Sequence, residues 1–304
     1  MSNAESASKK ARRDAARDHA REMREAAARK KKRNRLFVQG GVILGALAIA
    51  GVVLLVVTNL TRPPSPGPLN MASDGIILTG DGTNMSYEKT KAIAAGAEPV
   101  ASTPSTEAGV VSIVMYTDYQ CPICQQFETA NGDQLETWVK AGVATLEIHP
   151  IAILDGQSLG ARYSSRSTNA AACVANFEPD KFWAVNRAFY AQQPGEQTAG
   201  LTNAQITSLV ADAGAKTSEV ADCIANETFK TWVADATERS REPVPNSDLQ
   251  EIGGTPTVLV NGQQYTGAVT DAAAFTAFVN AIGAATQPVP DPETSTDPET
   301  DTEG

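Results

Sequence analysis

The sequence predicts an α/β protein in which a small core of strands and helices carries an inserted all-helical domain and follows one transmembrane helix. Three observations support this prediction. An apolar run of membrane-spanning length lies near the N-terminus, and short β-branched runs stand on both sides of a long region with helical signals. The chain has 304 residues, which is enough for one large domain or two small ones with a substantial core.

The N-terminal segment, residues 1–35, is strongly basic. It holds 13 Lys and Arg against 5 Asp and Glu, a net charge of +8, whereas the rest of the chain holds 12 against 30, a net charge of −18. A basic segment can bind nucleic acid, but this one leads directly into the apolar stretch 36–57. We therefore interpret it as a cytoplasmic signal for membrane topology and expect no nucleic-acid partner.

That apolar stretch predicts a transmembrane anchor within residues 36–60. Its 22 residues would form a helix of about 33 Å, which spans a bilayer core. A cleaved signal peptide is the alternative, but the basic and apolar regions are long for one and no Ala-x-Ala follows. Because basic residues precede the helix and are sparse after it, we expect a single-pass protein of the cell membrane whose domain lies outside the cytoplasm.

Two segments of biased composition flank the expected folded domain, residues 75–286. Residues 61–74 include the run Thr-Arg-Pro-Pro-Ser-Pro-Gly-Pro, which is typical of an extended, semi-rigid linker. Residues 287–304 repeat Asp-Pro-Glu-Thr and carry six acidic and no basic side chains. Since this tail has few apolar residues to bury, we expect it to be disordered.

The first part of the domain predicts a strand, a helix and a second strand parallel to the first. Residues 110–116, Val-Val-Ser-Ile-Val-Met-Tyr, are typical of a buried strand. Residues 122–140 have the apolar spacing of a helix, with Asn131-Gly132 as a candidate position for a kink. Residues 143–148 predict the parallel strand, which completes a βαβ unit.

A helical insertion is expected at about residues 155–245. Pro179 begins one helix, and Thr202 with Gln205 forms a capping box that starts another, which ends near Gly214.

Strand signals return after the insertion. Residues 257–260 predict a strand, and Asn261-Gly262 predicts a type I′ turn into residues 263–265. Thr270 is the expected cap of a final helix, residues 271–282. This order of elements describes a thioredoxin-like fold with an inserted all-helical domain.

Cys121 and Cys124, in the run Cys-Pro-Ile-Cys, are the candidate catalytic residues. They follow a buried strand and open a helix, where main-chain amides stabilise a thiolate and lower its pKa. Two intervening residues allow the sulfurs to close a small, exchangeable disulfide in which Cys121 faces solvent. An inert buried disulfide or a pair of unrelated core cysteines is the alternative.

A metal site is disfavoured by the pattern of cysteines. Four cysteines in an oxidising compartment favour disulfides, and zinc would require four ligands at suitable spacing. His149 is the one histidine after the anchor, and we expect it to be a core or loop residue rather than a catalytic one.

Two sequence motifs resemble the DsbA family of thiol-disulfide oxidoreductases. They are Thr117-Asp-Tyr-Gln-Cys-Pro-Ile-Cys-Gln-Gln-Phe-Glu128 and Gly254-Thr-Pro-Thr257, and the resemblance covers about residues 75–285. Residues 170–174, 180–183 and 201–202 of the insertion are similar to the membrane-tethered members found in high-GC Gram-positive bacteria.

The resemblance implies a substrate site and partners. Thr255-Pro256 would be the family's cis-proline loop beside the active disulfide, contacting bound substrate together with Pro122 and Ile123. No cofactor is implied beyond the redox-active cysteines. The implied partners are unfolded or reduced exported proteins and a quinone-linked membrane oxidase, either a vitamin K epoxide reductase homologue or a DsbB-like protein.

We therefore expect an enzyme that introduces disulfides into exported proteins through Cys121 and Cys124. A reductase or isomerase that works from the dithiol state is the first alternative. A non-catalytic peptide-binding module of the same fold is the second.

Two positions depart from the family pattern. Ile123 stands where oxidising members often have a histidine, and Met115 stands where better-known members have a buried carboxylate. Asp118 is the nearest acid, and we expect it to be a solvated residue at the end of a strand without a catalytic role.

Cys173 and Cys223 lie in predicted helices of the insertion, 50 positions apart. We expect a structural disulfide between them, with buried free thiols as the alternative.

Overall fold

A computed structural model describes Met23 and residues 65–105, 107 and 109–285. Apart from Met23, the predicted cytoplasmic segment, the anchor at residues 36–60 and the acidic tail lie outside the described residues. Within the described part, no helix has the length and apolar character needed to cross a bilayer.

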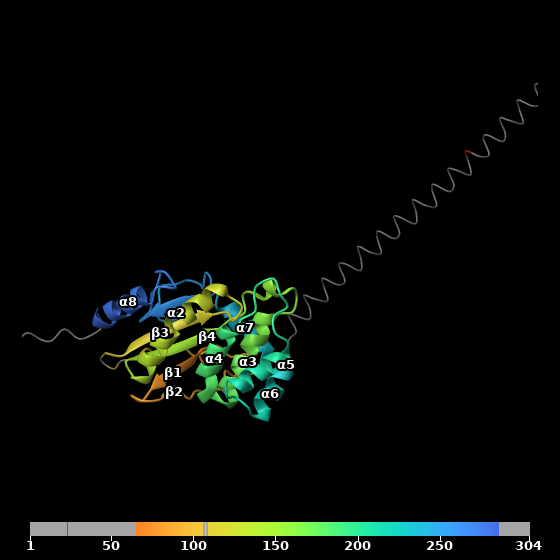
Figure 1. Ribbon diagram of the computed structural model, residues 1–304, viewed down its shortest axis with the longest axis horizontal. Helices are drawn as coiled ribbons and strands as arrows, with labels where there is room; N and C mark the ends of the chain where they lie inside the picture. The colour runs from red at the N-terminus through yellow and green to blue at the C-terminus, as the bar shows by residue number, and fades with distance from the viewer. Residues whose placement is uncertain (1–22, 24–64, 106, 108, 286–304) are drawn as a thin grey trace, which may run out of the picture. The chain divides into compact units, whose positions relative to one another are not determined.

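The described domain is built on a six-stranded sheet with the order β2-β1-β4-β3-β5-β6 (Figure 1). β3 (Val111–Thr117) and β4 (Ala144–Pro150) are its parallel pair, and α2 (Pro122–Lys140) connects them. The predicted βαβ unit is therefore confirmed. β1 (Ile76–Gly80) and β2 (Met85–Tyr87) add an antiparallel edge that the sequence analysis did not predict.

Both faces of β3 are buried, because alternate side chains of a strand point to opposite faces of the sheet. Ile113 and Met115 belong to the main hydrophobic core, which also contains Phe127 of α2 and Phe275 of α8 (Ala272–Ala285). The opposite face carries a second cluster of buried side chains: Tyr116, Ile151, Val244, Ile252 and Leu259. Burial on both faces explains why this strand is a continuous apolar run.

α2 continues as one helix through Asn131-Gly132, the candidate position for a kink. These two residues serve packing instead. A Cβ atom on Gly132 would lie 2.8 Å from Arg187 Nη1 and from Glu128 Oε1, so glycine leaves room for these two side chains beside α2. The Asn131 amide donates a hydrogen bond of 2.9 Å to the Val269 carbonyl, which joins α2 to the segment before α8.

The insertion between β4 and β5 is helical, as predicted, and α3 (Tyr163–Phe177) is its buried central helix. Thr202 and Gln205 form the predicted capping box, which starts α5 (Asn203–Asp212). The other helical elements of the insertion are η1 (Asp155–Ser158), η2 (Pro179–Lys181), α4 (Phe182–Ala191), α6 (Ser218–Ala225) and α7 (Lys230–Arg239).

The chain returns to the sheet through β5 (Thr257–Val260), which turns into β6 (Gln263–Gln264). Asn261 and Gly262 have φ angles of 46° and 81°, the positive values that the predicted type I′ turn requires. The predicted cap of the last helix is wrong by one residue. The Asp271 carboxylate, rather than Thr270, accepts the hydrogen bond from the Ala274 amide at 2.9 Å.

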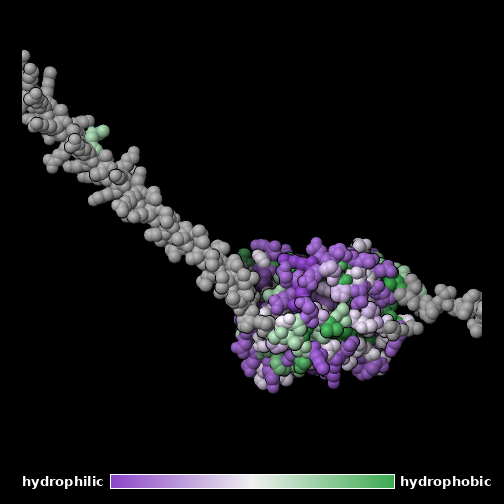
Figure 2. Space-filling model, turned by 180° about the vertical axis from the view of Figure 1, so that it is seen from behind, coloured by the Kyte–Doolittle hydropathy of each residue, from purple (hydrophilic) through white to green (hydrophobic). Residues whose placement is uncertain are grey.

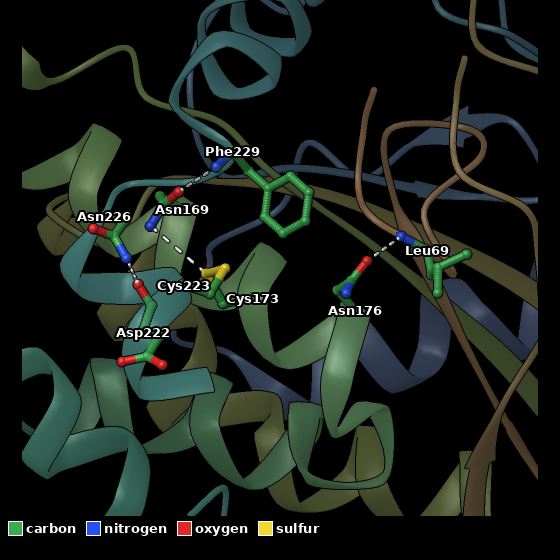
Figure 3. Close-up of a disulfide and its surroundings, with 8 residues drawn as sticks. All are labelled: Leu69, Asn169, Cys173, Asn176, Asp222, Cys223, Asn226 and Phe229. Atoms are coloured by element: carbon green, nitrogen blue, oxygen red, sulfur yellow. Dashed lines mark hydrogen bonds between the residues drawn. A yellow bond between two sulfur atoms is a disulfide. The ribbon is translucent and has the colours of Figure 1, made fainter. Parts of the chain in front are cut away.

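The folded domain begins before residue 75, so the linker expected at residues 61–74 is too long. Met71 is fully buried. The Leu69 amide donates a hydrogen bond of 2.9 Å to Asn176 of α3 (Figure 3), and the Asn70 side chain donates one of 2.8 Å to the Ala175 carbonyl. The Pro-rich composition concealed this packing, because it depends on α3, a distant element of the chain.

The surface seen from behind in Figure 2 is mostly hydrophilic, with apolar residues in separate patches. Ile123 and Leu159 are among the large apolar side chains exposed to solvent, at 44% and 68%.

Candidate active site

Cys121 and Cys124 lie where the chain passes from β3 into α2. Cys121 is the N-cap residue of the helix and Pro122 occupies its first turn, a position where proline's missing N–H costs no helical hydrogen bond. The Cys121 amide donates a hydrogen bond of 3.0 Å to the Asp118 carbonyl, which closes the turn before the helix. Both cysteines are free thiols in the structure.

Cys121 is less exposed than the sequence analysis expected. Cys121 is 6% exposed and Cys124 is 2% exposed. The reason is the loop before β5, because the Cys121 thiol donates a hydrogen bond of 3.1 Å to the Thr255 carbonyl. Cys121 is nevertheless the more accessible of these two cysteines.

The Thr255–Pro256 peptide bond is cis. β5 pairs with β3 so that Thr257 is opposite Tyr116, which brings this loop to the end of the strand that leads to the cysteines. Thr255 and Pro256 are half-buried, as is Pro122, whereas Ile123 is exposed. The four residues predicted to contact substrate therefore include accessible groups beside Cys121, and their role in binding stays a prediction.

The two thiols have opposite pKa shifts. A hydrogen bond with Cys124, aided by Thr255 and the main-chain amides of Cys124 and Ile123, lowers the pKa of Cys121 to about 6 despite burial. Burial raises the pKa of Cys124 well above its usual value. Near neutral pH, Cys121 therefore supplies the thiolate while Cys124 keeps its proton.

The expectation for Asp118 is wrong, because the residue is fully buried instead of solvated. Its carboxylate accepts hydrogen bonds from the amides of Gln120 (2.8 Å) and Leu154 (2.9 Å) and from the Ser164 hydroxyl (2.7 Å). Burial raises the pKa of Asp118 to about 6, against the effect of these hydrogen bonds. Ser164 belongs to the insertion. The insertion therefore buries Asp118, which would otherwise be exposed to solvent at the end of β3.

Three further polar groups near Cys124 were missed by the sequence analysis. The hydroxyls of Thr117 and Tyr190 share a hydrogen bond, and the Thr117 side chain also bonds to Cys124 and lowers its pKa. Glu128 is 3% exposed, and its carboxylate forms an ion pair with the Arg187 Nε atom at 3.5 Å. Burial raises the pKa of Glu128 to about 7, although Arg187 acts in the opposite direction.

His149 lies away from the exchange chemistry, as expected for a core residue. Its Nε2 atom is 3.0 Å from Glu147, and its ring stacks on Tyr116 with centroids 4.4 Å apart. Although burial raises the pKa of Glu147, the charge and hydrogen bonds of His149 and the hydroxyls of Ser102 and Ser73 lower it to about 2.

A disulfide joins Cys173 of α3 to Cys223 of α6 (Figure 3). Next to it, the Asn169 side chain accepts a hydrogen bond of 2.8 Å from the Phe229 amide and points its own amide at Cys173. These contacts link α3, α6 and the start of α7, which fits a structural role. Among the described residues, no cluster of His, Cys, Asp or Glu suits a metal ion.

Known proteins share this fold. The thioredoxin family model matches residues 105–281. Reduced DsbA from Mycobacterium tuberculosis is 25% identical with a TM-score of 0.52, and the match covers 69% of this chain and 92% of that one. The oxidised form of that protein is 26% identical with a TM-score of 0.51, and the match covers 71% of this chain and 94% of that one.

Oxidised BdbD from Bacillus subtilis is 17% identical with a TM-score of 0.50, over 74% of this chain and 100% of that one. At this identity the likeness concerns the fold alone. No curated protein matches the sequence of this chain.

The fold, the cysteine pair at the start of α2 and the adjacent cis-proline loop define a thiol-disulfide oxidoreductase of the DsbA type. The chain belongs to the thioredoxin family.

Proposed function

We propose that this enzyme oxidises thiols of exported proteins, and that the helix expected at residues 36–60 anchors it with the catalytic domain outside the cytoplasm. The observation that carries the direction of exchange is the placement of Cys121 at the N-terminus of α2, where neighbouring groups lower its pKa to about 6. A stabilised thiolate stabilises the dithiol enzyme, and this makes the corresponding disulfide a better oxidant.

The reaction begins with the Cys121–Cys124 disulfide. A substrate thiolate attacks the Cys121 sulfur, a substrate–Cys121 disulfide forms, and Cys124 leaves as a thiolate that takes up a proton because of its raised pKa. A second substrate thiolate then attacks the substrate sulfur of the mixed disulfide. Cys121 leaves as a stable thiolate, so two substrate thiols are oxidised and the enzyme disulfide is reduced.

Another protein must reoxidise the dithiol enzyme. We propose a quinone-linked membrane oxidase for this step, of the vitamin K epoxide reductase or DsbB-like type. A membrane anchor would raise the effective concentration of the domain near such a partner.

The reduction potential of the Cys121–Cys124 pair tests the direction. The full chain is equilibrated in glutathione buffers, the thiols are trapped by alkylation, and peptide mass spectrometry separates this pair from Cys173 and Cys223. Because a pKa of about 6 lies between those of thioredoxin and DsbA, we expect a potential between about −270 and −120 mV. A potential at or below about −270 mV would instead favour a reductase or isomerase.

The location is tested separately by adding protease to intact cells. The domain should be digested while a cytoplasmic marker protein survives. Protection of both would contradict the proposed topology.

A further inference from the structure

One side chain of the insertion bonds to the active-site turn at two points. Gln193 lies in the loop that follows α4, and its Nε2 atom donates hydrogen bonds to the carbonyls of Tyr119 (3.1 Å) and Cys121 (3.0 Å). A primary amide has two N–H donors, so it can serve both carbonyls at once. Gln193 therefore bonds to the carbonyl of the residue before Gln120 and to that of the residue after it.

These carbonyls belong to buried residues, since Tyr119 is fully buried and Cys121 is 6% exposed. Buried main-chain acceptors require partners within the protein. The Cys121 carbonyl also accepts a hydrogen bond of 3.2 Å from the Gln125 amide of α2, so Gln193 supplies its second donor and fixes it from the side of the insertion. The orientation of the Cys121 peptide group also decides where its sulfur lies relative to the amides of Ile123 and Cys124, which hydrogen-bond to that sulfur. A residue that fixes this peptide group thereby fixes the surroundings of the exchanging sulfur.

The insertion contacts the same turn at a second place. The carbonyl of Gln157, in η1, accepts hydrogen bonds from the Gln120 side chain (3.3 Å) and from the Gln197 amide (2.8 Å). Gln193 and Gln197 lie in the same loop, so that loop is bonded both to the turn and to η1.

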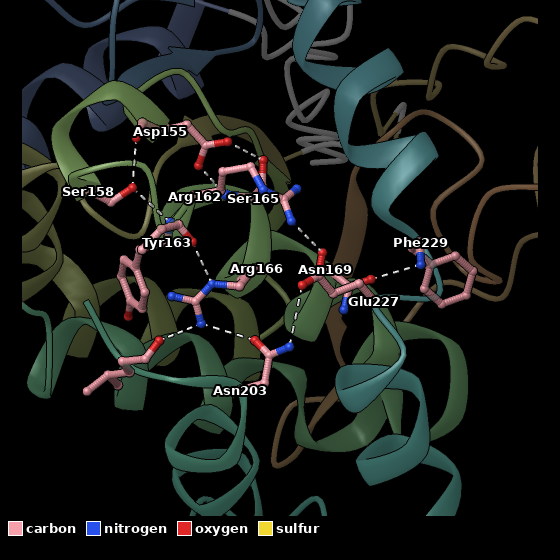
Figure 4. Close-up of polar contacts among 12 residues, drawn as sticks. Asp155, Ser158, Arg162, Tyr163, Ser165, Arg166, Asn169, Asn203, Glu227 and Phe229 are labelled. Carbon is pink, nitrogen blue, oxygen red and sulfur yellow. Dashed lines mark hydrogen bonds and ion pairs between the residues drawn. The ribbon is translucent and has the colours of Figure 1, made fainter. Parts of the chain in front are cut away.

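η1 itself is bonded to the buried helix α3 (Figure 4). The Asp155 carboxylate accepts hydrogen bonds from the Ser165 amide (2.9 Å) and hydroxyl (2.6 Å), and the Ser158 hydroxyl accepts one from the Tyr163 amide (3.0 Å). The groups that hold the active-site turn are therefore themselves held by the core of the insertion.

We propose that Gln193 is a positioning residue for thiol-disulfide exchange, which orients Cys121 through the carbonyls of Tyr119 and Cys121. This role makes the insertion part of the exchange machinery. The proposal rests on Cys121 being the exchanging sulfur and is independent of the direction of exchange.

Three variants of the full chain test it. Gln193→Met keeps the approximate length of the side chain and removes both donors, and Gln193→Glu keeps the shape but presents acceptors to two carbonyls. Gln192→Glu is the control, because it adds the same charge at the exposed neighbouring position. The rate of Cys121 alkylation by iodoacetamide is measured against pH, and peptide mass spectrometry identifies the modified cysteine.

We expect a midpoint near pH 6 in the unmodified chain and in Gln192→Glu. Both Gln193 variants should move the midpoint upward by about one pH unit, which corresponds to a roughly tenfold smaller thiolate fraction well below the midpoint. Unchanged midpoints in both variants would overturn the proposal, as would an equal shift in Gln192→Glu.

Circular dichroism shows whether each variant folds. If one Gln193 variant unfolds, the other still gives the result, and unfolding of both would assign Gln193 a structural role and overturn the proposal. Failure of the unmodified chain to oxidise a reduced model protein would contradict the proposed function without changing this alkylation measurement.

Discussion

The Cys121 thiol donates its hydrogen to the Thr255 carbonyl across 3.1 Å, although the two residues are 134 positions apart in sequence. A thiolate has no hydrogen to donate, so this bond exists while Cys121 is protonated and is lost on ionisation. The side chains of Cys124 and Thr255 and the amides of Ile123 and Cys124 are then the donors that stabilise the sulfur. Thr255 thus contacts Cys121 through its carbonyl while the sulfur is a thiol, and its side chain stabilises the thiolate.

The first prediction concerns Cys124 as a donor to Cys121. Because this hydrogen bond is the largest cause of the lowered pKa, Cys124→Ala should raise the pKa of Cys121 from about 6 toward its ordinary value near 9. Cys124→Ser keeps a donor at the same place, so its effect should be smaller. Thiolate absorbance at 240 nm against pH measures both variants, and equal midpoints for Ala and Ser would contradict the assignment.

The second prediction concerns Asp118. Asp118→Ala leaves three donors, two of them buried, without their acceptor and should reduce the free energy of unfolding by about 3 kcal/mol or more, since a bond to a charged group contributes about 1.5 to 3 kcal/mol. Asp118→Asn keeps one acceptor oxygen and should cost less. Both substitutions remove the negative charge of the Asp118 carboxylate, which repels the Cys121 thiolate. Both should therefore lower the pKa of Cys121.

Urea denaturation gives the stability of these Asp118 variants, and absorbance at 240 nm gives the thiol pKa. A stability equal to that of the unmodified chain would show that the three hydrogen bonds are not needed for folding.

The third prediction concerns pH and Glu128. Its pKa rises from 4.5 when unfolded to about 7 when folded, so the folded state binds the extra proton and loses stability as pH rises from about 4.5 to 7. Glu128→Gln imitates the protonated form. Its free energy of unfolding should exceed that of the unmodified chain by an amount that grows over this interval to about 3 kcal/mol.

Urea denaturation at several pH values tests this difference. Asp133→Asn is a suitable control, because Asp133 also pairs with Arg187 but its side chain is 94% exposed. A difference for Glu128→Gln that does not change with pH would contradict the prediction.

The fourth prediction concerns the insertion disulfide. Replacing Cys173 and Cys223 together with alanine should reduce the free energy of unfolding by about 3 to 5 kcal/mol, the range expected for a closed loop of 50 residues. The Cys121–Cys124 potential should stay the same, because these cysteines lie in a different part of the domain. Thermal unfolding and the glutathione equilibrium measure the two quantities, and a changed potential would reveal coupling between them.

The local signals of the sequence predicted the exchange centre well. A continuous apolar run followed by Cys-Pro indicates a buried strand that leads into a helix, and the structure has β3 and α2 at these places. The cis bond before Pro256 came from the resemblance alone, because an ordinary X-Pro bond is usually trans.

Features that depend on distant residues were not predictable in this way. Asp118 is a polar residue directly after a strand, a position that is usually solvated. Its burial depends on Ser164 and Leu154, which lie 46 and 36 positions further along the chain. β1 was missed because a strand of five residues that ends in Thr-Gly has a weak pattern of its own, and its place between β2 and β4 depends on distant residues. Gln193 resembles any polar loop residue until the carbonyls that it bonds are known.

The pairing of β3 with β5 has a consequence for the order of folding. All of the insertion lies between these strands, so the sheet has a contact of very high sequence separation at its centre. A growing chain carries Cys121, Cys124 and Cys173 long before it carries the loop that covers Cys121. The exchange centre is completed late, and during that interval incorrect pairing among its own cysteines competes with native assembly.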